Sequence, residues 1–391
     1  MTRESAGEFE AFAVAAPGLE SVVAGELLNL RLKSPHVVDG GVEFGATRSQ
    51  LYEANLHLRT ASRVLVRLAK YRALTFAELE RRAQRIPWEK VLTRGERVTL
   101  RVTCRKSRLY HSGAVAERIE RDLVNRMGAS ITKASGDDDA DVLESRTQLI
   151  VVRLDHDHCT VSADSSGAHL HQRGYRTSVT AAPMRETLAA ALVLAIGWNR
   201  RSLLLDPFCG SGTIPIEAAL IAAGIAPGMN RDFRFMNWPG HDHDEWQRVR
   251  DNAKRRERRD LVPAIIGSDR SAAAIRASTD NAERAGVTAL LRFEKRDALR
   301  IEPESSSGWL VSNPPYGVRL GDARETRRLL TEFGHQLRQR FVAWHVGLLS
   351  AVPLERVTGI KLDPKFRTTN GGLHVQFLVG NVPGLPGRAA S

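Results

Sequence analysis

Residues 203–220 read LLLDPFCGSGTIPIEAAL, and this stretch decides the fold class. Residues 203–205 form a short apolar run typical of a buried strand, and residues 213–223 have the spacing of a helix. Between them, Gly210 and Gly212 let the backbone turn tightly and let a ligand approach closely. A strand, a glycine loop and a helix in this order indicate an α/β domain with a parallel sheet.

The same alternation continues along the chain. Further apolar runs predict strands at residues 264–267, 291–294, 309–312, 344–349, 357–362 and 374–379. Helical spacing is found at residues 184–196, 271–285 and 323–340. We therefore expect a doubly wound parallel sheet over residues 169–391, with ligands at the carboxyl ends of its strands.

The first part of the chain has a different pattern. Strand-like residues at 9–14 and 37–44 alternate with helical spacing at 18–30 and 47–58, and a further strand-like run at 63–68 follows. This order predicts an α+β, ferredoxin-like unit over residues 1–60. A second α+β unit is expected over residues 61–168, with helices at 75–85 and 112–127 and strands at 97–105, 149–154 and 159–163. Thr75 and Glu78 have the spacing of a capping box, and Cys104 is expected in the core.

The charge of the chain favours a polyanionic partner. It has 57 Lys and Arg residues against 45 Asp and Glu residues, a formal net charge of +12. Clustered cations gain free energy by releasing counterions from phosphates, so nucleic acid is the favoured class of partner. Arg-rich composition also arises in GC-rich genomes, and charge alone leaves that alternative open.

Cysteine usage and hydropathy restrict the compartment. Cys104, Cys159 and Cys209 are far apart without CxxC spacing, which argues against a disulfide framework or a zinc knuckle. No run reaches the roughly 18 apolar residues of a membrane span, and the first residues, MTRESAGEFE, are charged where a signal peptide is apolar. We expect a soluble protein of the reducing cytoplasm with no membrane partner.

Polar residues follow four of the expected strands, and the first is Asp206. The loop DPFCGSGT is neither a phosphate-binding GxxxxGK[ST] loop nor GxGxxG. A carboxylate beside a glycine loop suits a zwitterionic ligand whose ammonium needs an acceptor. A plain strand-to-helix turn is the alternative.

Asp269 and Asp297 follow the next two strands. Asp269 has the spacing of an acidic residue that binds ribose hydroxyls, although it could equally be a helix N-cap. Asp297 could accept a hydrogen bond from an adenine amino group or could be a surface carboxylate. Taken in order, these residues describe a pocket for a ligand with an amino-acid end, a ribose and an adenine.

The fourth strand end reads NPPY, residues 313–316. Proline donates no backbone hydrogen bond and is rejected by central strands, so Pro314 and Pro315 must follow the strand. They hold backbone carbonyls rigidly between the amide of Asn313 and the ring of Tyr316.

DPFCGSGT, GSD, RDA and NPPYG in this order resemble the motifs of class I S-adenosylmethionine-dependent methyltransferases. NPPY is similar to the version that methylates exocyclic amino groups of bases. Upstream, LHQRGYR and APMRETLAAAL resemble THUMP-containing RNA guanine-N2 methyltransferases, and SRLYHSGAVAERI at residues 107–119 resembles their THUMP domain. The resemblance covers nearly the whole chain. It implies a Rossmann-like methyltransferase domain at 169–391 and a THUMP RNA-binding domain at 61–168.

The resemblance also implies the roles of single residues. Asp206 and Gly210 should contact the methionine part of the cofactor, Asp269 the ribose, and Asp297 with Ala298 the adenine. The rest of the implied cofactor site consists of Pro207, Cys209, Gly212, Thr213 and Asn313. The implied catalytic set consists of Asn313, Pro314, Pro315 and Tyr316. In this set the Asn313 side chain and the Pro314 carbonyl should accept hydrogen bonds from the target amine, and Tyr316 should stack on the base.

Two acceptors suit this chemistry. An exocyclic amine is a poor nucleophile because its lone pair is delocalised into the ring. Acceptors at both hydrogens favour a pyramidal nitrogen and aim the lone pair at the sulfonium methyl group, so catalysis is mainly orientation. Asn313 is uncharged and cannot be a conventional base, and the proton is expected to leave after methyl transfer. No metal is required.

Basic residues offer contacts with RNA. Arg105, Lys106 and Arg108 precede the helix that begins at Ser112 and could meet phosphates, although a solvated loop is the alternative. The run KRRERR at 254–259, within an Arg-rich insertion at 230–260, could do the same or form an exposed helix face. DHDH at 155–158 could bind metal, but a solvated hairpin tip is preferred. HDHD at 241–244 could also bind metal, but it lacks further ligands.

These features together support the hypothesis that the protein methylates the N2 amino group of a guanosine in RNA, with 23S ribosomal RNA favoured over transfer RNA as the substrate. Adenine-N6 methylation of a nucleic acid is an alternative, because NPPY serves both amines. An inactive RNA-binding assembly factor is another.

Overall fold

The computed structural model describes residues 9–133, 147–176, 184–316 and 323–383. The chain divides into two compact units. The N-terminal unit contains residues 1–15, 23–170 and 230–251, and the C-terminal unit contains residues 16–22, 171–229 and 252–391.

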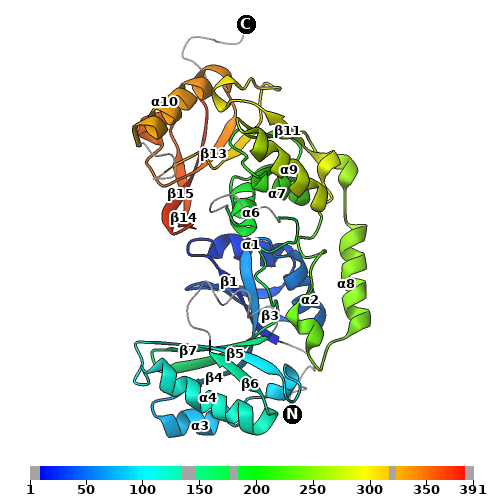
Figure 1. Ribbon diagram of the computed structural model, residues 1–391, viewed down its shortest axis with the longest axis vertical. Helices are drawn as coiled ribbons and strands as arrows, with labels where there is room; N and C mark the ends of the chain where they lie inside the picture. The colour runs from blue at the N-terminus through cyan, green and yellow to red at the C-terminus, as the bar shows by residue number, and fades with distance from the viewer. Residues whose placement is uncertain (1–8, 134–146, 177–183, 317–322, 384–391) are drawn as a thin grey trace. The chain divides into compact units, whose positions relative to one another are not determined.

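Among the described residues, the N-terminal unit has one eight-stranded sheet with the order β2-β3-β1-β4-β8-β7-β5-β6. Figure 1 labels several of its strands, among them β1, β4, β5 and β7. Its strands are β1 (Phe9–Ala15), β2 (Lys33–Val38), β3 (Gly41–Ala46), β4 (Ala61–Arg72), β5 (Arg97–Arg105), β6 (Ser130–Lys133), β7 (Gln148–Asp155) and β8 (His158–Asp164). Its helices are α1 (Glu20–Asn29), which begins in the C-terminal unit, α2 (Arg48–His57), α3 (Phe76–Ala83) and α4 (Ser112–Met127). β1 pairs with β4, and β4 pairs with β8, so both predicted α+β units contribute to one sheet.

The single strand expected at residues 37–44 is wrong. Asp39 and Gly40 form a turn, and β2 and β3 pair as an antiparallel hairpin on either side of it. Gly40 has φ +81°, a conformation that glycine adopts without the strain that a Cβ causes. The Asp-Gly dipeptide is a strong hairpin signal, and an apolar run on both sides masked it.

Local signals elsewhere in this unit behave mostly as expected. Gly128, with φ +62°, ends α4. Thr75 caps α3 by accepting from the Glu78 amide, but the Glu78 carboxylate accepts from the Leu74 amide instead of completing a capping box with Thr75. Cys104 is only partly buried and is not the core residue that strand alternation predicted.

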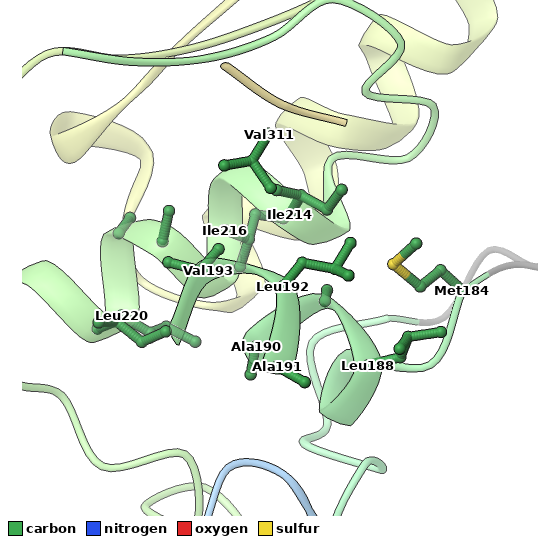
Figure 2. Packing of buried hydrophobic residues seen from close by; sticks show 14 of the residues in the cluster. Met184, Leu188, Ala190, Ala191, Leu192, Val193, Ile214, Ile216, Leu220 and Val311 are labelled. Carbon is green, nitrogen blue, oxygen red and sulfur yellow. The ribbon is translucent and has the colours of Figure 1, made fainter. Parts of the chain in front are cut away.

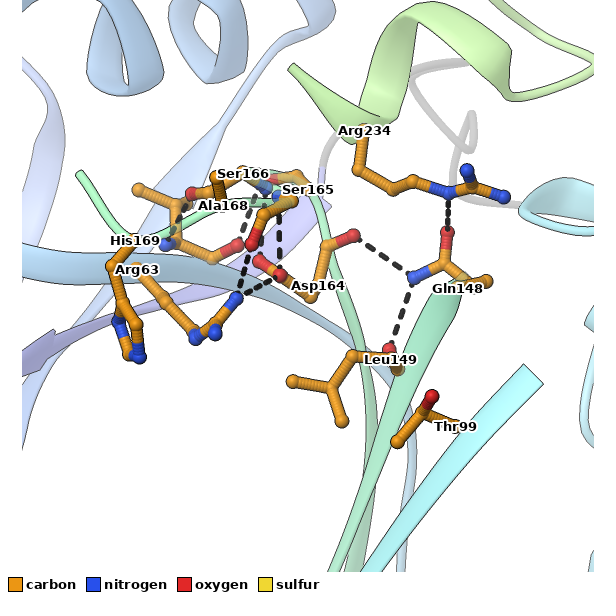
Figure 3. A network of polar contacts seen from close by, with 12 residues as sticks. Arg63, Thr99, Gln148, Leu149, Asp164, Ser165, Ser166, Ala168, His169 and Arg234 are labelled. Atoms are coloured by element: carbon orange, nitrogen blue, oxygen red, sulfur yellow. Dashed lines mark hydrogen bonds and ion pairs between the residues drawn. The ribbon is translucent and has the colours of Figure 1, made fainter. Parts of the chain in front are cut away.

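A buried polar network joins the inserted residues 230–251 to this sheet (Figure 3). Arg63 pairs with Asp164 at 2.7 Å, and the Gln148 side chain donates to the Asp164 carbonyl at 2.9 Å. From the insertion, Arg234 and Trp238 donate to the Gln148 side-chain oxygen at 3.3 and 2.8 Å. Paired buried polar groups of this kind fix one arrangement, because an unpaired one costs about 1 to 3 kcal/mol. Part of the Arg-rich insertion is therefore structural.

The C-terminal unit has, in the described ranges, a seven-stranded sheet with the order β11-β10-β9-β12-β13-β15-β14. Its strands are β9 (Leu204–Asp206), β10 (Ile265–Asp269), β11 (Arg292–Lys295), β12 (Trp309–Ser312), β13 (His345–Ser350), β14 (Asp363–Asn370) and β15 (Leu373–Asn381). β9 to β13 are parallel, whereas β15 runs antiparallel to β13 and to β14. The fold is the expected Rossmann-like α/β fold with an antiparallel hairpin at one edge.

The strand expected at residues 357–362 is wrong. Glu355–Thr358 form the short helix α11, which ends at Gly359 with φ +65°. The strand follows as β14, where Phe366, Thr368 and Asn370 are buried and alternate with exposed residues. Because β14 is an edge strand, it tolerates Pro364.

Apolar clusters cover both faces of this sheet. α6 (Glu186–Ala195), α7 (Thr213–Ala222) and α9 (Ala272–Arg284) lie over one face, and α10 (Ala323–Arg340) and α11 lie over the other. α6 and α7 are apolar almost all round, and Figure 2 shows Leu192 and Val193 of α6 close to Ile216 of α7. α8 (His243–Arg255) lies in the insertion. None of the described helices is long and apolar enough to cross a membrane.

Candidate active site

The carboxyl ends of parallel strands meet at one edge of the C-terminal sheet and line a cavity of about 410 Å³. Its lining contains ten of the residues singled out in the sequence: Asp206, Pro207, Cys209, Gly210, Thr213, Asp269, Asp297, Ala298, Asn313 and Pro315. Three of the others, Gly212, Pro314 and Tyr316, are not among the lining residues. The cavity has the size of a pocket for a small molecule or cofactor.

Asp206 is a buried carboxylate at the end of β9. Its Oδ1 accepts a hydrogen bond from the Ser312 hydroxyl at 2.5 Å and another from the Phe208 amide at 3.1 Å. Burial raises the pKa of Asp206 to about 7, the charge of Asp269 adds to the rise, and the two hydrogen bonds oppose it. A cationic ligand in the cavity would stabilise the charged form.

The glycine loop is held from two sides. The Gly210 amide donates to Asp269 Oδ2 at 3.1 Å. On the other side, two α9 side chains donate to loop carbonyls, Ser278 to Gly210 at 2.8 Å and Asn281 to Ser211 at 2.9 Å. Sequence reasoning missed Ser278 and Asn281, because nothing local separates them from other polar residues on an amphipathic helix.

Gly212 has φ +81°, and a Cβ there would lie 2.7 Å from the Phe293 ring. Any larger residue would displace that ring or the loop. Gly212 therefore allows the loop to pack closely against Phe293.

Asp269 and Asp297 differ in exposure and in their partners. Asp269 is half-buried and accepts from two amides, with Oδ1 2.8 Å from the Ser271 amide. The N-cap of α9 is Ser271 and not Asp269. Asp297 is exposed and accepts from the Leu299 amide at 2.9 Å, so it caps a single helical turn. Each carboxylate keeps further lone pairs for a ligand.

The NPPY segment presents a buried acceptor at the cavity. Asn313 lines it, and its Oδ1 is buried with no hydrogen-bond partner among the described residues. Tyr316 is 7% exposed, and its hydroxyl accepts from the side-chain amide of Asn370 at 2.8 Å. An orphaned buried acceptor is uncommon in proteins and points to a ligand donor.

Two family models match this chain. One, described as "RMKL-like, methyltransferase domain", covers residues 173–356, and the other, described as "RlmL ferredoxin-like domain", covers residues 10–65. "Putative RNA methyltransferase slr0064" of Synechocystis sp. is 34% identical over 369 residues, which cover 94% of this chain and 95% of that protein. This chain belongs to the RMKL-like methyltransferase family.

Two further similarities concern the length of the chain and the ligand of a similar structure. "Ribosomal RNA large subunit methyltransferase K/L" of Syntrophotalea carbinolica is 36% identical over 94% of this chain but only 53% of that protein, so the chain spans about half its length. The crystal structure of SMU.472, complexed with SAH, superposes with a TM-score of 0.84 at 30% identity, covering 98% of this chain and 100% of the other. The buried carboxylate of Asp206 and the glycine loop fit a ligand with an ammonium group, and the Asn313 oxygen, which has no partner among the described residues, fits a hydrogen-bond donor.

The upstream motif LHQRGYR packs against the helix behind the glycine loop of the methyltransferase. Arg173 Nε donates to Glu217 of α7 at 2.7 Å, and the Tyr175 hydroxyl donates to the same oxygen at 3.0 Å. Arg173 and Glu217 are both buried. This motif therefore fixes α7, and with it the loop that precedes it.

Arg105 ends β5, and Lys106 and Arg108 lie on the following loop, which is tied to the β7–β8 turn. The Arg108 amide donates to Asp157 Oδ1 at 2.7 Å, and the Asp157 amide donates to the Ser107 hydroxyl at 3.0 Å. Arg105 is exposed and forms a 3.8 Å ion pair with Asp39, which is still more exposed. The 155–158 turn thus has a structural use that needs no metal.

The structure also shows where the possible metal ligands at residues 241–244 and the basic run at residues 254–259 lie. His241 Nδ1 lies 3.1 Å from the Tyr52 hydroxyl, and Asp242 accepts from the Glu245 amide at 2.9 Å. Within the part of the chain that the structure describes, no three His, Cys, Asp or Glu residues are grouped as metal ligands. In the basic run, Arg259 pairs with Glu257 at 2.9 Å and also donates to the Gly286 carbonyl. All the cations of the run are exposed.

Proposed function

We propose that this chain transfers the methyl group of S-adenosylmethionine to the exocyclic N2 amino group of a guanosine in RNA, with 23S ribosomal RNA as the substrate. The observation that carries the proposal is the orphaned, buried Oδ1 of Asn313 at the wall of the cofactor cavity. A base amino group is a donor that satisfies it.

The methyl transfer follows from two fixed acceptors. Asn313 Oδ1 and the Pro314 carbonyl accept the two amine hydrogens, favour a pyramidal nitrogen and direct its lone pair along the axis of displacement. The cofactor, when bound, supplies the electrophilic methyl group. The N–C bond forms as the C–S bond breaks, and the positively charged nitrogen then loses one proton to water. Pro314 and Pro315 keep the acceptors rigid.

The cofactor-binding residues act through charge and hydrogen bonds. Asp206 faces the ammonium group of the methionine part, which stabilises the carboxylate against its burial. Asp269 accepts from the ribose hydroxyls, and Asp297 accepts from the adenine amino group beside Ala298. The loop at Gly210 and Gly212 allows the methionine part to approach the backbone.

The choice of RNA rests on the relatives and on charge. The relatives reported above are named for RNA and for ribosomal RNA of the large subunit. The net charge of +12 and the exposed Arg105, Lys106 and Arg108 suit phosphate contacts. We assign RNA recognition to the ferredoxin-like unit at 1–60 and the THUMP unit at 61–168, and the reaction to 169–391, where the pocket receives an extruded base. Transfer RNA is the second candidate.

A labelling experiment tests this function. The purified protein is incubated with methyl-labelled cofactor and separate ribosomal and transfer RNA fractions, and the nucleosides are then identified by mass spectrometry. Label in N2-methylguanosine of large-subunit RNA is the expected result. Label in N6-methyladenosine would show that adenine, and not guanine, is the target base. Label only in transfer RNA would show that transfer RNA is the substrate. No label in any RNA would indicate an inactive assembly factor.

A further inference from the structure

The C-terminal unit contains a second cavity, of about 680 Å³. It is formed by the residues that follow β13, by α11 and by the β14–β15 hairpin. Among the described residues, its lining shares no member with the lining of the cofactor cavity. The larger of the two cavities is therefore not used by the cofactor.

The lining of this cavity combines apolar surface with a few polar groups. Val352, Pro353 and Leu362 supply apolar surface, while Thr368 and Gln376 supply polar groups. The Thr368 hydroxyl is buried and has no hydrogen-bond partner in the described part of the chain. Apolar walls with a few polar groups are typical of sites that bind flat heterocycles, and a buried hydroxyl without a partner favours a ligand that supplies one.

The cavity lies at the same edge of the sheet as the reaction. β13 is the parallel neighbour of β12, with Ser312 paired to Leu348, so residues 350–353 leave the sheet beside the NPPY segment. Thr368 and Asn370 are both on the buried face of β14 and stand two residues, or about 7 Å, apart. Asn370 holds Tyr316. Adjacent nucleotides of a single strand can span that separation.

The surface around the cavity is suited to a phosphate backbone. Residues 355–367 carry four cations and two carboxylates, all of them exposed: Arg356, Lys361, Lys365, Arg367, Glu355 and Asp363. Arg367 and His374 also line the cavity itself. Phosphate contacts of this kind position a nucleic acid, while pockets for bases select its sequence.

We propose that this cavity binds the base of a nucleotide adjacent to the methylated guanosine. The inference rests on the proposed function, since it assumes an RNA substrate. It adds a specificity site: the target base enters beside Asn313, and a neighbouring unstacked base is held between residues 350–353 and β14.

The test fills the cavity and removes the base that would occupy it. Val352 is 36% exposed at the cavity, so Val352→Trp adds bulk there without disturbing the core. The substrates are oligoribonucleotides around the methylated guanosine, each with one abasic residue at a successive flanking position. For the wild type, one abasic position should raise KM for RNA about tenfold and leave kcat nearly unchanged.

With Val352→Trp, KM should rise by a similar factor on intact RNA, and the abasic substitution at that position should add nothing. Thr368→Val, which keeps the side-chain shape, should reduce the same abasic penalty. Leu28→Trp, at an exposed position on α1, is the matched control and should leave KM unchanged. Cofactor affinity should be the same in every variant.

The outcomes separate this inference from the function on which it rests. Wild-type methylation with no penalty at any abasic position, or a full penalty retained in Val352→Trp, would overturn the second site while leaving the proposed function intact. Absence of methylation of any RNA by the wild type would remove both.

Discussion

The side-chain amide of Asn370, at the end of β14, donates a hydrogen bond to the hydroxyl of Tyr316, which follows β12, across 2.8 Å. Both residues are buried. The bond joins the edge hairpin to the NPPY segment and fixes the ring that would support the base. In the proposed mechanism, Asn370 therefore positions Tyr316 for a reaction that takes place beside another strand.

We expect Asn370→Ala to lower kcat for methyl transfer about tenfold, because loss of the bond lets the Tyr316 ring move. KM for the cofactor should not change. Tyr316→Phe removes the same bond from the other side and keeps the ring. The double variant should be no slower than the slower single variant, and additive losses in the steady-state kinetics would show that the two residues act separately.

The buried carboxylate of Asp206 should make the free protein less stable at higher pH. Its pKa is raised from 3.8 to about 7, so its contribution to stability is full below the unfolded value and is lost as pH rises through about 7. Asp206→Asn lacks this dependence. Without cofactor, it should exceed the wild type in stability at pH 8 by a few kcal/mol and not at pH 4, measured by chemical denaturation. Equal differences at both pH values would contradict the assignment.

Cofactor affinity should have the opposite pH dependence. Only the charged form of Asp206 pairs with an ammonium group, so affinity should rise up to about pH 7. It should fall again once the amino group of the cofactor loses its proton, near pH 8. Titration calorimetry measures both limbs, and the rising limb should be absent in Asp206→Asn, which binds weakly throughout.

Asn281 should affect cofactor binding without touching the cofactor. Asn281→Ala leaves the Ser211 carbonyl without its donor and should weaken cofactor binding about tenfold through movement of the glycine loop. Thr279→Ala is the matched control, since Thr279 is on the same helix and its hydroxyl donates only to the exposed helix backbone. Calorimetry should separate the two variants. Equal affinities would mean that the loop keeps its shape unaided.

The basic loop before α4 should contribute to the salt dependence of RNA binding. Replacing Arg105, Lys106 and Arg108 by Ala should reduce the slope of log K against log salt by about 0.7 to 0.9 for each lost phosphate contact. A variant of equal charge, with Ala at the exposed Arg81, Arg82 and Arg85 of the α3 region, is the control. Filter-binding titrations in a salt series measure both, and identical slopes would remove this loop from the interface.

The sequence revealed those parts of the site that local patterns encode. Asp206 follows an apolar run directly, whereas one or two small residues separate Asp269 and Asn313 from such a run. The ends of parallel strands necessarily meet at one sheet edge. Ser278, Asn281 and Asn370 could not be found in this way. Their roles depend on tertiary contacts, and Asn370 is 54 residues from Tyr316 along the chain.

The wrong predictions about the fold also arise because tertiary contacts are not visible in local sequence patterns. The sequence of the β2–β3 hairpin predicts one continuous strand, because apolar residues flank its turn on both sides. The short apolar pattern around residues 355–358 is compatible with a strand or a helix, and tertiary packing selects the helix α11. The pairing of β4 with β8 joins strands about a hundred residues apart, which no local pattern encodes.

The most direct test of the central claim compares modified nucleosides in large-subunit ribosomal RNA from cells with and without this protein. Mass spectrometric mapping should show one N2-methylguanosine lost in its absence, restored by the wild type and not restored by Asn313→Ala, although that variant still binds the cofactor. An unchanged N2-methylguanosine content, or full restoration by Asn313→Ala, would contradict the claim that the orphaned oxygen of Asn313 orients the amino group of a guanosine for methyl transfer.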